Sequence, residues 1–232
     1  FGSFTALSGK SAGQLILKGL KLFNMGLMFN LTLNFNLILS VSNGNMEANI
    51  WPYVFGVDIL QFAGISLIVI APVKTLKSKF ILPVTLCIFS ALAGQYLADC
   101  TPVNPTAQYV SAFFYGSTPW SYFPLLPWLA YPLAGMIFYG MQERYDLIFL
   151  STKIKSALCL VFAIVLAFTI KDAIILASDL PAYYHHGILF FLWVVLFVCF
   201  YALCLNELTN LAGNTLVARY IKWLGKNVTQ IV

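Results

Sequence analysis

The stretch that decides the fold class runs from Pro119 to Gly140 and reads PWSYFPLLPWLAYPLAGMIFYG. It is apolar enough to cross a bilayer, although Pro124, Pro127 and Pro132 interrupt it and aromatic residues crowd its first half. Proline removes a backbone donor from a helix and clashes with the preceding turn. Membrane helices tolerate this where neighbouring helices or water satisfy the freed carbonyl groups. We therefore predict a kinked helix that packs against other helices or lines a cavity.

The composition of the whole chain is that of a membrane protein. The chain is 60% hydrophobic and 9% charged, whereas soluble domains carry about 25% charged residues. The net charge of +5 does not indicate a nucleic-acid partner, because the basic residues are scattered between apolar runs and form no dense patch. The lipid bilayer is the partner that this composition predicts.

Apolar runs of about 20 residues are long enough to span a bilayer as helices, and six such runs are present. We predict an all-α fold, a polytopic transmembrane helical bundle that forms a single domain over residues 1–232. A basic amphipathic helix on the cytoplasmic surface is expected at Asn214–Gly225. The predicted spans are Leu20–Val41, Val54–Pro72, Phe80–Ala98, Tyr122–Met141, Ser156–Ser178 and Gly187–Leu205.

The basic residues predict the orientation of these spans. Of the 13 Lys and Arg residues, all except Lys171 fall at alternate ends of the six predicted spans. Cytoplasmic loops carry the excess of Lys and Arg in membrane proteins. The basic loops are therefore expected to be cytoplasmic, and the expected location is a bacterial cytoplasmic (inner) membrane.

Polar residues inside the first two spans are candidates for a polar site. Asn30 and Asn34 are one helical turn apart, so we expect that face to point at another helix. Asp58 lies a few residues into the second span, and Gln61 shares its helical face. A carboxylate inside a membrane span is costly and marks a functional candidate, although near the outer end it could equally cap the helix.

His185 and His186 are the only histidines, and they fall in the short connection before the last predicted span. An imidazole titrates near neutral pH and commonly acts as a general base, but two histidines at a membrane surface can also be plain interfacial residues. We predict no metal site, because a zinc site needs three or four suitably spaced ligands. The five cysteines have no C-x-x-C spacing, which argues against metal and disulfide roles.

The order of four segments resembles the heparan-alpha-glucosaminide N-acetyltransferase-like family of multi-span membrane acyltransferases. The resemblance covers nearly the whole chain, and the order of the segments is more specific than any one of them. The four segments are Lys18–Leu27 (KGLKLFNMGL), Asp58–Gly64 (DILQFAG), Tyr122–Met136 (YFPLLPWLAYPLAGM) and Trp223–Asn227 (WLGKN).

The resemblance implies transfer of an acyl group from a cytoplasmic acyl-CoA donor, without a metal, to a glycan-like acceptor on the outer side. It also implies a larger bundle, so we expect this chain to be a fragment that is truncated at both ends. The family's essential histidine is expected upstream, and His185 and His186 do not map onto it. By their position, His185 and His186 are our catalytic candidates, and Asp58, Gln61, Trp120, Tyr122 and Trp128 are our substrate-binding candidates.

Two other functions stay open at this point. The chain could be a non-catalytic integral membrane subunit that packs against other membrane subunits, or against further copies of itself, in a larger membrane complex. It could also be a transporter, but transporters usually contain paired broken helices, and only one strongly broken helix is evident here. Membrane acyltransferase is therefore the preferred hypothesis.

Overall fold

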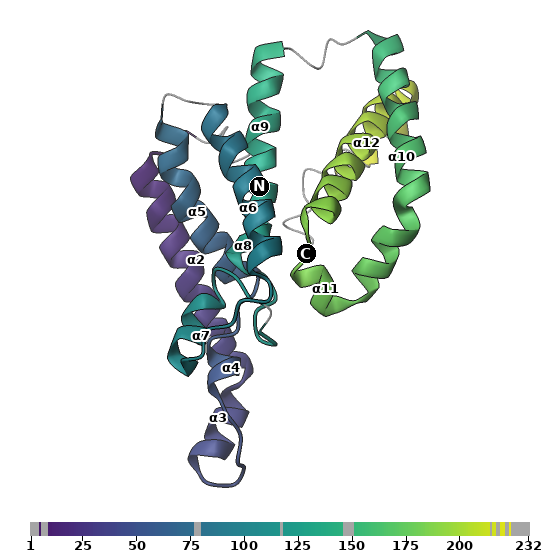
Figure 1. The fold of residues 1–232 in the computed structure, drawn as a ribbon. Coiled ribbons are helices and arrows are strands. Elements are labelled where there is room, and N and C mark those ends of the chain that lie inside the picture. Colours follow the sequence, from purple (N-terminus) through teal and green to yellow (C-terminus); the bar gives the residue numbers. More distant parts are fainter. Residues whose placement is uncertain are drawn as a thin grey trace. The chain divides into compact units, whose positions relative to one another are not determined.

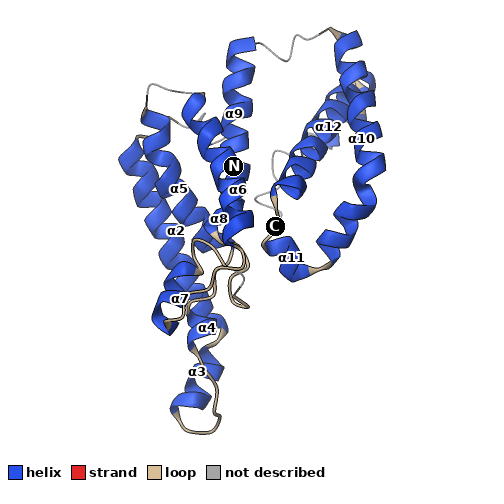
Figure 2. Ribbon diagram, in the orientation of Figure 1, coloured by secondary structure: helices blue, strands red, loops and turns tan. Residues whose placement is uncertain are grey.

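The computed structural model describes residues 5, 9–76, 80–116, 118–145, 151–213, 215, 216, 219, 220 and 223. Within these residues every regular element is an α-helix, as Figures 1 and 2 show, apart from one isolated parallel bridge between Val57 and Ser121. The helices are α2 (Ala12–Leu33), α3 (Phe35–Ser42), α4 (Trp51–Val54), α5 (Ile59–Thr75), α6 (Ile81–Leu97), α7 (Pro105–Ser111), α8 (Leu125–Trp128), α9 (Ala130–Tyr145), α10 (Thr152–Ser178), α11 (Leu180–Tyr184) and α12 (Ile188–Ala212).

Two of the described helices are both long and apolar enough to span a membrane, over Lys153–Ser178 and Ile188–Leu205. A third span results if α2 and α3, which meet at a bend of 60°, are counted as one. α5 and α6 are apolar as well, but each has 17 residues, at the short end of the range that spans a bilayer. The prediction of an all-α helical membrane protein is confirmed, and the count of six spans stays a prediction.

The chain divides into two compact units. Unit 1 comprises Phe1–Phe149 and Lys171–Leu192, and unit 2 comprises Leu150–Ile170 and Trp193–Val232. Most of the predicted amphipathic helix at Asn214–Gly225 lies outside the described residues.

The first predicted span has the wrong limits. α2 begins at Ala12 because Ser11 and Gln14 form a capping box, in which each side chain accepts a hydrogen bond from the backbone N–H of the other. The helix stops at Leu33, and Asn34 occupies the bend before α3. The span predicted as one helix over Leu20–Val41 is therefore longer at its start and broken near its end.

α2 and α5 pack closely along unit 1, and glycine allows the approach. A Cβ atom on Gly19 would lie 2.6 Å from the carbonyl oxygen of Gly64, and one on Gly64 would lie 2.7 Å from the carbonyl oxygen of Gly19. Small residues let helix backbones approach in this way in membrane proteins.

The proline-rich stretch is less helical than predicted. Regular helix begins only at Ala130, after the short element α8, inside which Leu126 has non-helical backbone angles. The predicted helix that began at Tyr122 is thus wrong in its first half, because Pro124 and Pro127 prevent continuous helical hydrogen bonding.

Two side chains of α6 donate hydrogen bonds to backbone carbonyl groups beside this break. Ser90 Oγ donates to the carbonyl oxygen of Pro127 at 3.4 Å, and Cys87 Sγ donates to that of Ala130 at 3.4 Å. Gly94 packs against Pro127 so closely that a Cβ atom would lie 2.6 Å from the proline nitrogen. The irregular backbone therefore faces protein, as expected for such a segment at membrane depth.

In unit 1, the basic residues Lys10, Lys74 and Arg144 lie at one end of the helices, and the candidate site residues lie at the other end. The Nζ atom of Lys74, near the end of α5, donates to the carbonyl oxygen of Lys10 at 3.4 Å, just before α2 begins. Arg144 lies in the last turn of α9, at the same end of unit 1 as the start of α6 (Figure 1). The segments described next lie at the opposite end of the same helices.

Candidate functional site

A two-segment backbone bridge joins the start of α5 to the proline-rich stretch. The N–H of Val57 donates to the carbonyl oxygen of Trp120 at 2.8 Å, and the N–H of Tyr122 donates to the carbonyl oxygen of Val57 at 2.9 Å. Asn30 of α2 holds the adjoining turn, since its Nδ2 donates to the carbonyl oxygen of Gly56 at 2.8 Å. The bridge brings together two groups of predicted binding residues that lie some sixty positions apart in the sequence.

Asp58 and Gln61 form the N-terminal capping box of α5. Asp58 Oδ1 accepts the N–H of Ile59 at 2.6 Å, and Gln61 Oε1 accepts the N–H of Asp58 at 3.2 Å. The capping alternative raised by the sequence is therefore realised for Asp58. Gln61 is fully buried against Gly26, and its Nε2 has no hydrogen-bond partner among the described residues. Such a buried unpaired donor is uncommon and needs an explanation.

Trp120 and Tyr122 point to different surroundings. The ring of Trp120 packs on that of Tyr109, with centroids 5.1 Å apart, and its buried Nε1 has no partner among the described residues. Tyr122 is 43% exposed, and its ring meets the edge of Tyr184 at 5.3 Å.

His186 lies in a closed aromatic environment at the start of α12 and is only 1% exposed. Its ring stands perpendicular to that of Trp128, with centroids 5.0 Å apart. Trp128 Nε1 donates to the carbonyl oxygen of Tyr184 at 2.8 Å, which ties the end of α11 to the proline-rich stretch. Trp128 and His186 are thus brought into direct contact.

The hydrogen bonds of His186 define its protonation state. Nδ1 lies 2.8 Å from the carbonyl oxygen of Tyr183, and because a carbonyl can only accept, Nδ1 carries the proton. Burial lowers the pKa of His186 from 6.5 to about 4, so the ring is neutral at pH 7. Its Nε2 then accepts the hydroxyl proton of Tyr131 at 2.7 Å.

His185 occupies a different environment from its neighbour. Its side chain is half-buried, and burial lowers its pKa, while a hydrogen bond with the backbone of Ser121 acts in the opposite direction. Ser121 is also the bridge partner of Val57. The two histidines, the Trp120–Tyr122 segment and the cap of α5 therefore meet at one end of unit 1.

Two residues that build this arrangement were not among the candidates from the sequence. Tyr131 lies in the same apolar stretch as Trp128, three positions later. Its hydroxyl, which bonds to His186, and this spacing, which places two side chains on one helical face, were the only signs of its role in the sequence. Gln95 of α6 accepts the N–H of Ile188 at 3.2 Å and so positions the start of α12. Asn30, which was expected to face another helix, donates to the carbonyl oxygen of Val54, the last residue of α4, and to that of Gly56 in the turn that follows.

Within the part of the chain that the structure describes, no three His, Cys, Asp or Glu side chains gather closely enough to hold a metal ion.

Comparison with known proteins gives one match. Residues 4–168 match the family described as Heparan-alpha-glucosaminide N-acetyltransferase, catalytic. No curated protein and no solved structure is similar enough to this chain to count as a match. The matched range includes the cap of α5 and the whole proline-rich stretch, and it ends before the two histidines.

Proposed function

The chain belongs to the heparan-alpha-glucosaminide N-acetyltransferase catalytic family, and we propose that it is a membrane-embedded acyltransferase, or part of one. The donor is an acyl-CoA on the cytoplasmic side, and the acceptor is a glycan-like hydroxyl or amine on the other side. The family match over residues 4–168 carries this proposal.

The reaction needs a base near the acceptor. The acceptor oxygen or nitrogen attacks the carbonyl carbon of the thioester, the carbon–sulfur bond breaks, and coenzyme A leaves as the thiolate. A positioned side chain that takes the acceptor proton contributes typically about 100-fold to 10,000-fold in rate. Holding donor and acceptor together contributes further, because the step no longer depends on a chance encounter.

We assign the base to His185 and a positioning role to His186. His185 is the more accessible ring, and although burial lowers its pKa, the hydrogen bond with the backbone of Ser121 acts against that shift. Both nitrogens of His186 are already engaged, and its low pKa keeps it neutral. A neutral His186 matters for this role, since a charged neighbour would lower the pKa of His185 further.

Two buried donors support acceptor binding near the same end of unit 1. The amide Nε2 of Gln61 and the indole Nε1 of Trp120 have no partner among the described residues, and we propose that both donate to oxygen atoms of a substrate. Asp58 fixes Gln61 through the capping box. The ring of Tyr122 and the edge of Trp128 offer aromatic surface for a sugar ring.

The sidedness of the proposal is supported by charge. The candidate residues lie at the end of unit 1 opposite to Lys10, Lys74 and Arg144. If the basic ends are cytoplasmic, the acceptor approaches from the outer side. A bacterial inner membrane as the location remains part of this proposal.

One observation favours the second candidate, a non-catalytic membrane subunit that packs against other subunits or against further copies of the chain. Both ring nitrogens of His186 hold neighbouring elements in place, as expected for a structural histidine. In that case His185 would be a plain interfacial residue.

Transfer of labelled acetyl groups by the full-length protein in liposomes tests the proposal. Acetyl-CoA is supplied on one side and a glucosamine-terminated oligosaccharide on the other. We expect label in the oligosaccharide, a loss of about 100-fold in His185→Ala, and partial recovery of that variant with added imidazole. Val103→Ala, at a fully exposed loop position, should transfer normally.

The outcomes separate the two candidates. Absence of transfer by the full-length protein, with both substrates bound, would favour the non-catalytic subunit. Normal transfer by His185→Ala would keep the acyltransferase and remove His185 as its base.

A further inference from the structure

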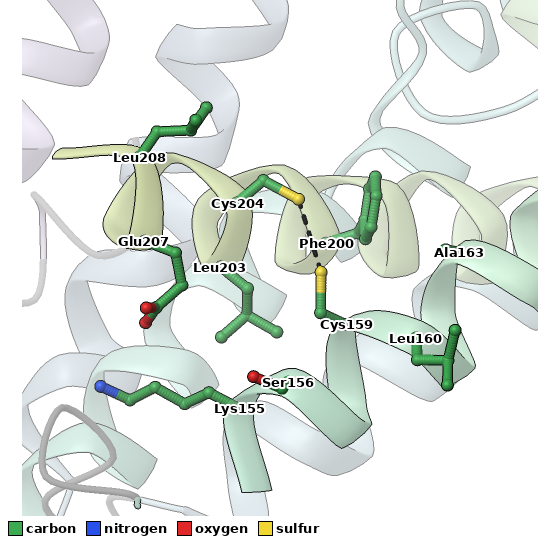
Figure 3. Close-up of a pocket in the computed structure, with 10 residues that line it drawn as sticks. All are labelled: Lys155, Ser156, Cys159, Leu160, Ala163, Phe200, Leu203, Cys204, Glu207 and Leu208. Atoms are coloured by element: carbon green, nitrogen blue, oxygen red, sulfur yellow. Dashed lines mark hydrogen bonds between the residues drawn. The ribbon is translucent and has the colours of Figure 1, made fainter. Parts of the chain in front are cut away.

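Two cysteines that are far apart in the sequence meet inside unit 2. Cys159 of α10 and Cys204 of α12 are 45 positions apart, and their Sγ atoms lie 3.5 Å from each other. Both are free thiols and both side chains are half-buried. Figure 3 shows the two sulfur atoms pointing at each other from facing helices.

The contact is specific to this pair of thiols. Cys199 lies on the same helix as Cys204, five residues earlier, and at about 100° per residue the two side chains point roughly 140° apart. Cys199 is therefore directed away from the face that meets Cys159. The sequence argued against a disulfide because it has no C-x-x-C spacing, but the relative register of two helices creates a pair that no spacing rule detects.

A cavity of about 540 Å³ borders both thiols, and Lys155, Ser156 and Glu207 line it together with apolar residues. Lys155 and Glu207 lie within one helical turn of Cys159 and Cys204 respectively, and Figure 3 shows both charged side chains on the same side of the sulfur pair. The pair therefore lies next to the polar ends of its helices and not at the middle of a membrane span.

We propose that Cys159 and Cys204 form a redox site, at which a small-molecule disulfide such as oxidised glutathione converts the two thiols into a disulfide between α10 and α12. One cysteine thiolate attacks a sulfur of glutathione disulfide and releases one glutathione, which takes up a proton. The second cysteine thiolate then attacks the cysteine sulfur of this mixed disulfide and releases the second glutathione. The two cysteines lose two electrons and two protons in total, and the two glutathione molecules gain them.

The geometry favours the second step over a lasting glutathione adduct. A disulfide has a sulfur–sulfur distance of about 2.05 Å, so the two sulfur atoms, which are 3.5 Å apart, have to approach by about 1.5 Å to form the bond. The bond would then fix the spacing of α10 and α12 in unit 2. This site is independent of the proposed acyl transfer, since it lies in unit 2 and none of the candidate site residues belongs to that unit.

Thiol counting on the full-length protein in membranes tests this site. The membranes are equilibrated with buffers of increasing ratio of oxidised to reduced glutathione, and the protein is then denatured and alkylated. We expect the wild type to lose two reactive thiols in one step. Intact mass should fall by two hydrogen atoms, and peptide mapping should recover the Cys159–Cys204 cross-link.

Matched variants distinguish this pair from the other cysteines. Cys199→Ser should still form the cross-link, whereas Cys159→Ser and Cys204→Ser should not. The mapping of the wild type needs no variant, so the test remains decisive if a substitution prevents folding. A persistent glutathione adduct, a cross-link to Cys199, or an unchanged number of reactive thiols in the most oxidising buffer would each overturn the proposal.

Discussion

The two units are both built from apolar helices, yet they differ in what determines their packing. In unit 1, glycines permit close backbone contact, and side chains such as Asn30 and Ser90 bond to backbone carbonyl groups. The two long helices α10 and α12 contribute most of the described part of unit 2. In the most apolar 18-residue stretch of each helix, only 11% of the residues are buried. Unit 1 should therefore depend on the identity of individual residues, while much of unit 2 should tolerate any apolar side chain.

The largest expected effect concerns the contact between α6 and the proline-rich stretch. In Gly94→Ala the added Cβ would lie 2.6 Å from the nitrogen and 2.7 Å from the Cα atom of Pro127, and backbone atoms cannot move aside cheaply. We expect a destabilisation of about 3 kcal/mol, measured as a loss of folded protein on size-exclusion chromatography and a lower thermal midpoint.

Gly140→Ala is the matched control for this substitution. Gly140 also lies in a helix of unit 1, but a Cβ atom there would meet no described atom within 4 Å. Alanine has the higher helix propensity, so this variant should be neutral or slightly stabilised. Equal losses in both variants would show that the close approach at Gly94 does not decide the packing of unit 1.

A smaller effect is expected from the buried histidine when the pH falls. The pKa of His186 is about 4 in the folded protein and 6.5 in the unfolded chain, so the unfolded chain binds more protons between these values. Stability contributed by the neutral ring is therefore present above pH 6.5 and is lost as the pH falls toward 4. Between pH 7 and pH 5 the loss is about 2 kcal/mol.

The measurement compares the free energy of unfolding of the wild type and His186→Gln at several pH values. The wild type should lose stability on acidification, and the glutamine variant should lose less. His185→Gln is the control. The pKa of His185 is also lowered by burial, but this variant keeps His186 and should therefore keep the part of the pH dependence that His186 causes. Parallel pH curves for the wild type and His186→Gln would contradict the assignment of His186 as a buried neutral ring.

The third prediction concerns the turn before α5. Asn30→Ala removes the Nδ2 donor that bonds to the carbonyl oxygens of Val54 and Gly56. The two carbonyl groups then lose a hydrogen-bond donor, and solvent replaces it only in part. We therefore expect a destabilisation of about 1 to 2 kcal/mol. Thermal unfolding in detergent measures the change.

Asn34→Ala is the internal comparison for Asn30. Among the described residues, the Nδ2 of Asn34 bonds locally, to the carbonyl oxygen of Asn30 one turn earlier, so its removal should cost clearly less. The same stability for both variants would mean that the contact between α2 and the turn adds nothing to unit 1.

These residues also show what the sequence could and could not predict. Apolar runs predicted a helix in each of the six regions, and the shared face of Asp58 and Gln61 was evident from their spacing. The end of α2 at Leu33 could not be predicted from hydropathy, because the residues after the bend are just as apolar. Ser90, Cys87 and Gln95 were overlooked because their roles depend on partners in distant segments.

The smallest effect is expected in unit 2, at Phe168 of α10. Its side chain is 83% exposed, and lipid tails are about as apolar as a leucine side chain. Phe168→Leu should therefore change the free energy of unfolding by less than about 0.5 kcal/mol. Leu166→Ala, two residues earlier on the same helix, is the contrast, because Leu166 is buried and its truncation leaves a gap. If Phe168→Leu were as damaging as Leu166→Ala, the exposed face of α10 would need a specific protein partner, and the distinction between the two units would fail there.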